Sequence, residues 1–87
     1  MKIKLELFGA SRDFSNKDHL EIEVQDKASI NDLRNEIIKH VDKNFSGNEN
    51  FIKVVKYSAF CSENNEIISD NYKITKNQKI GIIPPIG

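Results

Sequence analysis

The residues best suited to chemistry lie at the C-terminal end of the chain, where a β-branched run meets two prolines. Residues 79–83 are predicted to form a buried strand, Pro84 and Pro85 follow directly, and the sequence ends on Gly87. Neither proline can donate a backbone hydrogen bond, and each favours extended backbone in the residue before it. We therefore expect residues 84–87 to project as a stiff arm of about 12 Å, since polyproline geometry rises about 3.1 Å per residue.

The tip of this arm is Gly87, which has no side chain and carries the terminal carboxylate of the sequence. A terminal carboxylate is ionised at neutral pH, and a glycine without a side chain leaves the backbone at the tip unobstructed. The sequence has no Gly-rich phosphate loop and no Ser/His/Asp arrangement, so we expect the chain alone to catalyse nothing.

Metal and disulfide chemistry is not indicated. His19 and His40 lie in different predicted elements with no acidic or cysteine cluster beside them, so no metal site is predicted. Cys61 is the single cysteine, which excludes an internal disulfide and a cysteine-based zinc site. A reduced, cytoplasmic setting fits this composition, with Cys61 as a buried and unreactive thiol.

Length and charge narrow the class of protein. The 87 residues predict one domain over residues 1–87. The 13 basic and 13 acidic residues cancel and are interleaved, so we expect neither nucleic acid nor an anionic membrane as a partner. No apolar run approaches the roughly 20 residues of a membrane span, and residues 1–6 alternate and carry an acid, unlike a signal peptide.

Two alternating segments open the chain. Residues 2–8 place Ile3, Leu5 and Leu7 on one face and Phe8 on the other, and residues 20–24 alternate in the same way. A period of two is typical of a half-buried strand. The loop between the two segments favours an antiparallel pair.

A helix is predicted to follow these strands. Ser29 is a suitable N-cap, and Asp32 follows at a position where its charge favours the positive helix end. An apolar stripe recurs at three- and four-residue spacing, at Ile30, Leu33, Ile37 and Val41. The helix should end near Lys43 or Asn44.

The second half of the chain is predicted to be extended. Residues 51–61 are rich in apolar and aromatic side chains, and we predict a strand over residues 54–60. Residues 67–68 should form a short pairing segment, before the last strand at residues 79–83. This order excludes a doubly wound sheet, which needs a helix after each strand. The predicted fold class is α+β: a ubiquitin-like β-grasp, with one main helix on one face of a mixed sheet and the first and last strands adjacent.

An exposed apolar patch is predicted at the base of the arm. Counting outward from the core-facing positions places Phe8 and Ile83 on the solvent face of neighbouring strands, and Ile67 or Ile68 could extend the patch. Exposed aromatic and aliphatic clusters mark interfaces. We therefore predict a partner interface at Phe8, Ile83 and Ile67.

The C-terminal end resembles that of the small, sulfur-carrier subunit of molybdopterin synthase, in which a strand, two prolines and an aliphatic residue precede terminal glycines. Residues 80–86 carry this likeness. Fainter similarity covers residues 7–12, 29–34 and 74–80, although Lys76-Asn77-Gln78 replaces the family's usual Asp-Gly-Asp.

The resemblance implies a specific chemistry. An E1-like activating enzyme would use ATP to adenylate the carboxylate of Gly87, and sulfur would then replace the adenylate to leave a thiocarboxylate. The tail (Pro84, Pro85 and Ile86) would enter the catalytic large subunit and deliver sulfur to cyclic pyranopterin monophosphate, forming the molybdopterin dithiolene. The chain itself would bind no cofactor and would be the non-catalytic part of a heterotetramer.

One departure from the family and two other functions stay open. The family ends in two glycines, whereas this sequence ends on Gly87 alone; we expect that the tail has been cut short, and the alternative is a divergent relative. The chain could also carry sulfur for tRNA thiolation or thiamin synthesis, although thiamin carriers generally lack the proline pair. The last alternative is a non-catalytic, ubiquitin-like interaction module that uses the Phe8 face.

Overall fold

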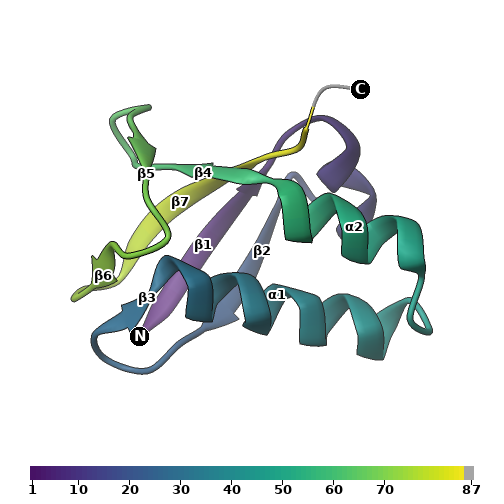
Figure 1. Ribbon diagram of the computed structural model, residues 1–87, viewed down its shortest axis with the longest axis horizontal. Coiled ribbons are helices and arrows are strands. Elements are labelled where there is room, and N and C mark those ends of the chain that lie inside the picture. Colours follow the sequence, from purple (N-terminus) through teal and green to yellow (C-terminus); the bar gives the residue numbers. More distant parts are fainter. Residues whose placement is uncertain (86–87) are drawn as a thin grey trace.

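Five strands form a mixed sheet in the order β2-β1-β7-β4-β5 (Figure 1). The structure is a computed structural model, and it describes residues 1–85. The strands of the sheet are β1 (Lys2–Leu7), β2 (His19–Glu23), β4 (Ala59–Cys61), β5 (Ile67–Ile68) and β7 (Gln78–Ile83). Two short strands that the sequence analysis did not predict, β3 (Ala28–Ser29) and β6 (Lys73–Ile74), pair separately.

The first and last strands lie side by side near the centre of the sheet, as predicted. Strand β7 pairs in parallel with β1, which pairs antiparallel with β2 on its other side. The alternating residues Ile3, Leu5 and Leu7 are buried, and so are Ile80 and Ile82 of β7. These residues form the sheet side of the core because a strand sends alternate side chains to opposite faces.

Helix α1 (Ile30–Asn44) begins where the sequence predicts. The Asp32 amide donates to Ser29 Oγ over 3.1 Å, and the Ser29 amide donates to Asp32 Oδ2 over 2.9 Å, which completes a capping box. The hydrogen bond from the Ser29 amide is the main cause that lowers the pKa of Asp32 below its usual value. The four residues of the apolar stripe are all buried: Ile30, Leu33, Ile37 and Val41.

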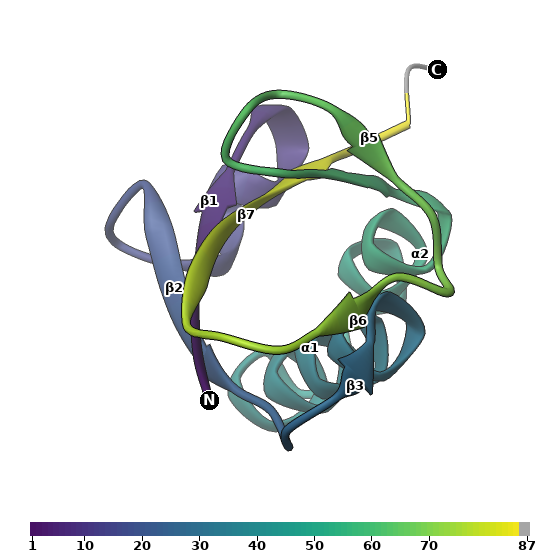
Figure 2. The same cartoon turned by 90° about the vertical axis from the view of Figure 1, so that its left-hand side faces the viewer.

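The strand predicted over residues 54–60 is wrong for most of its length. Helix α2 (Glu49–Tyr57) occupies residues 54–57, and β4 begins only at Ala59. Asn48 Oδ1 accepts hydrogen bonds from the amides of Asn50 and Phe51, which caps this helix. Both helices lie on the same side of the curved sheet (Figure 2).

Tertiary packing explains why residues 54–57 are helical although their sequence favours a strand. The Phe51 ring lies 5.2 Å from that of Phe14 and 5.0 Å from that of Phe45, measured between ring centroids. Phe14 belongs to the 3₁₀ helix η1 (Gly9–Phe14), in a region that was predicted only as a loop. The β-branched Val54 and Val55 favour a strand locally, but this aromatic cluster is formed when Phe51 projects from a helix.

Arg34 of α1 joins the second helix to the sheet. Its Nη1 donates to the carbonyl oxygens of Val55 (2.8 Å), Lys56 (3.1 Å) and Ser58 (2.7 Å). Its Nη2 lies 2.8 Å from Asp70 Oδ1, and its guanidinium lies 4.9 Å from the centroid of the Phe60 ring. One side chain therefore satisfies the carbonyls at the end of α2, where helical hydrogen bonding stops.

We expect Arg34→Lys to lower the free energy of unfolding by about 2 kcal/mol, because one ammonium group cannot satisfy all these acceptors. Urea denaturation followed by circular dichroism measures the change. Lys39→Ala on the same helix is the control, since the Lys39 side chain is 74% exposed and pairs only with Glu36 at the surface. It should change the free energy by less than about 0.5 kcal/mol. Equal losses in the two variants would contradict the role given to Arg34.

Candidate functional site

The root of the C-terminal tail lies against the segment that follows β1. Leu7 at the end of β1 pairs with Ile82 near the end of β7, so both strands finish at the same end of the sheet. After β7 the chain passes Gly9, whose φ is +54°. A Cβ atom added to Gly9 would lie 3.5 Å from Pro84 Cγ. Pro84 therefore packs on bare backbone at the point where the chain leaves the sheet.

An apolar stripe crosses the face of the sheet that is opposite the helices. Cys61 pairs with both Gly81 and Ile67, so these residues share that outer face. A Cβ on Gly81 would lie 2.7 Å from Cys61 Sγ and 2.8 Å from Phe8 Cε2. The Phe8 ring and the Cys61 thiol therefore flank the glycine backbone. We call Phe8, Cys61, Ile67 and Ile83 the outer stripe.

The exposure of the outer stripe differs along its length. Ile67 is 68% exposed and Phe8 is 37% exposed, whereas Cys61 is buried. Ile83 is half-buried beside Pro84, so the stripe continues to the tail root. Exposed apolar clusters are common at sites of protein–protein contact, so the outer stripe is a candidate interface.

Two solved structures resemble this chain over nearly its full length. One is a protein proposed to be molybdopterin converting factor subunit 1 of Pyrococcus furiosus, with a TM-score of 0.68 at 23% identity, covering 98% of each chain. The other is SAMP1 of Haloferax volcanii, with a TM-score of 0.68 at 11% identity, covering 99% of this chain and 97% of the other. No protein-family profile and no curated protein matches. The fold is the ubiquitin-like β-grasp.

The β-grasp brings together the interface residues that the sequence predicts. Phe8, Ile83 and Ile67 share the outer face, whereas Ile68 packs against the core. Their role in binding stays a prediction. Pro84 and Pro85 form the described part of the tail, while the predicted Ile86 and reactive Gly87 lie outside the described residues.

Two members of this surface were missed by the sequence analysis. Gly81 was counted only as part of the last strand, and Cys61 only as an inert thiol. The alternation of Ile80 and Ile82 places Gly81 outward, where an aromatic side chain on the neighbouring strand can cover it. The partner of Cys61 depends on strand pairing, which the sequence alone does not specify.

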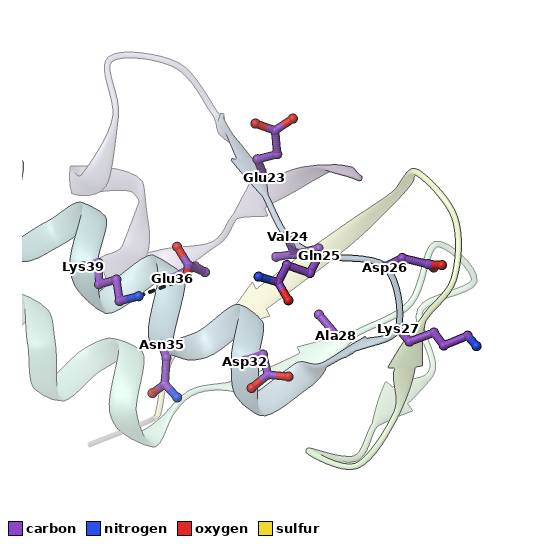
Figure 3. A pocket seen from close by; sticks show the side chains of 10 residues that line it. All are labelled: Glu23, Val24, Gln25, Asp26, Lys27, Ala28, Asp32, Asn35, Glu36 and Lys39. Atoms are coloured by element: carbon purple, nitrogen blue, oxygen red, sulfur yellow. Dashed lines mark hydrogen bonds and ion pairs between the residues drawn. The ribbon is translucent and has the colours of Figure 1, made fainter.

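Two hollows lie away from the tail in the β-grasp domain, between β2 and α1. The larger, of about 600 Å³, lies where β2 leads into β3 and is lined mainly by polar side chains, including Glu23, Asp32 and Lys39 (Figure 3). The smaller, of about 320 Å³, shares Glu23, Glu36 and Lys39 with it. Because Lys2 at the start of β1 pairs with Glu23, the larger hollow is at the end of the sheet remote from the tail.

The histidines occupy separate settings. His19 Nδ1 lies 3.1 Å from Asp18 Oδ1, and this hydrogen bond is the main cause that lowers the pKa of Asp18. His40 Nδ1 contacts Asn44 on α1. Within residues 1–85, no group of three or more His, Cys, Asp and Glu residues could hold a metal ion. None of the helices in that range is long and apolar enough to cross a membrane.

We expect Gly81→Ala to destabilise the protein by about 1–3 kcal/mol, because the new methyl group would overlap the Phe8 ring and the Cys61 thiol. A double-mutant cycle with Phe8→Ala tests the cause: Gly81→Ala should cost less when the ring is absent. Urea unfolding of the four proteins measures this. Equal costs in both backgrounds would show that Phe8 does not lie over Gly81.

Proposed function

We propose that this protein is a sulfur-carrier subunit of molybdopterin synthase. The observation that carries the proposal is the position of the tail root. A chain end that starts with two prolines leaves a central strand of the β-grasp sheet, directly beside an apolar outer face. One structural neighbour was itself proposed to be molybdopterin converting factor subunit 1, which agrees in fold with this assignment.

The proposed chemistry uses the peptide end and no side chain. The carboxylate at the end of the native tail attacks the α-phosphate of ATP on an E1-like activating enzyme, releasing pyrophosphate and forming an acyl adenylate. Hydrosulfide, at the oxidation level of sulfide, then attacks the acyl carbon and displaces AMP to leave a thiocarboxylate. Packing of Pro84 on Gly9 sets the direction of the tail, so less conformational entropy is lost when the end enters a partner.

The proposed partner of the outer stripe is the catalytic large subunit. Phe8 and Ile67 would become buried against it, while Ile83 would connect the interface to the tail. The end of the tail would then deliver its sulfur to cyclic pyranopterin monophosphate, and a second thiocarboxylated chain would supply the other sulfur atom of the dithiolene. The chain contributes positioning and the sulfur atom, and the large subunit contributes the catalytic side chains of a cytoplasmic heterotetramer.

The second structural neighbour is compatible with an alternative function. SAMP1 has the same fold over nearly its whole length at 11% identity. A carrier for another sulfur pathway, or an interaction module without tail chemistry, is therefore the competing proposal.

The full-length protein with its native C-terminus tests the tail chemistry. After incubation with the cognate activating enzyme, ATP and a sulfur donor, its intact mass should rise by the replacement of one oxygen by one sulfur. A variant truncated after Pro85 is the matched control and should show no change. An unchanged mass for the full-length chain would leave only the interaction module.

A second experiment tests the partner face. Phe8→Ser should weaken binding to the large subunit by about tenfold or more, because a buried aromatic contact is lost at the interface. Tyr72→Ser is the matched control: Tyr72 is 39% exposed, close to the 37% of Phe8, and is not part of the outer stripe. Calorimetric titration measures both affinities. Equal effects would exclude the outer stripe as the interface and would not bear on the tail chemistry.

A further inference from the structure

Strand β2 is one edge of the five-stranded sheet, and half of its backbone groups face away from the sheet. Met1 and Val24 exchange hydrogen bonds, and the Leu7 amide donates to the Asp18 carbonyl. Along an antiparallel ladder, residue pairs that are hydrogen-bonded alternate with pairs that are not. The backbone N–H and C=O groups of Leu20 and Ile22 therefore bond to β1. The N–H and C=O groups of Glu21 and Glu23 consequently point outward from the edge.

A groove runs beside this open edge. The hollow of about 320 Å³ is bounded by Glu21, Ile22 and Glu23 of β2 and by residues of α1 that include Lys39 and Lys43. It continues into the hollow of about 600 Å³. A strand added to β2 would therefore find space for the alternate side chains that point toward α1.

The acidic side chains of β2 determine which kind of strand can pair with its edge. Glu21 and Glu23 are exposed and lie on the outer face, and Figure 3 shows the Glu23 carboxylate pointing away from the side chains of α1. On the β1 side, Lys4 lies opposite Glu21 and Lys2 lies opposite Glu23. The side of the two glutamates that faces away from β1 is therefore free for an added strand. A second copy of β2 would bring acids opposite acids, which is unfavourable.

We propose that the β2 edge and the adjoining groove bind an extended segment of a partner protein by strand addition. The segment alternates basic residues, which face Glu21 and Glu23, with apolar residues, which contact Ile22 and the aliphatic stem of Lys39. This site is separate from the function proposed above: β2 and β5 are opposite edges of the sheet. A partner can bind there while the outer stripe and the tail are engaged elsewhere.

A blocked peptide of alternating lysine and valine is a direct probe. Added to the isotope-labelled full chain, it should shift the amide resonances of Glu21 and Glu23 and those of α1 near Lys39, and leave Phe8 and Ile67 unchanged. The same peptide with glutamate for lysine should bind about tenfold more weakly. Absence of shifts at β2, or equal binding of the two peptides, would overturn the proposal.

Two variants separate strand addition from simple charge attraction. Glu21→Pro keeps the β1–β2 ladder, because that N–H faces outward, but removes the donor that an added strand needs. It should bind the lysine peptide at least about fivefold more weakly than Glu21→Gln, which removes only the charge.

The control is Glu66→Gln, which changes an exposed acid in the β4–β5 turn and should bind like the native chain. Equal binding by Glu21→Pro and Glu21→Gln would refute strand addition. Unfolding curves confirm that each variant is folded.

Discussion

The parallel pairing of β1 with β7 is the constraint on which the rest of this structure depends. It places two runs of aliphatic side chains, one from each end of the sequence, at the centre of one sheet. Because the strands are parallel, their carboxyl ends finish together, and the segment after β1 meets the segment after β7. The contact between Gly9 and Pro84 follows from this pairing. The tail root is therefore held by the best-buried part of the core.

The end of α2 and the segments that follow it are joined to α1 by one half-buried guanidinium. Arg34 satisfies the carbonyls at the end of α2 and the carboxylate of Asp70 while it lies over the Phe60 ring. A fork of five donors on a rigid plane can bridge a helix end, a strand and a loop at once, which a lysine could not do. Strand β4 follows this junction directly and pairs with β7, with Cys61 opposite Gly81.

The outer face is divided between two kinds of surface. Near β2 it carries paired charges, with Lys4 opposite Glu21 and Lys2 opposite Glu23. Toward β4 and β5 it is apolar, and Ile67 is its most exposed member. Charges protect an open sheet edge from pairing with copies of itself, whereas an apolar face is buried only by a partner. The two surfaces are therefore suited to different occupants.

The sequence by itself determined the alternating strands β1 and β2, the capped helix α1 and the proline-led exit of the tail, because each rests on local periodicity or on the fixed backbone of proline. It also placed Phe8 and Ile83 on the outer face. Only the tertiary structure decided that residues 54–57 are helical, since the Phe51 cluster joins segments distant in sequence. It likewise decided that Gly81 and Cys61 lie beside Phe8, because strand register is set by long-range pairing and not by neighbouring residues.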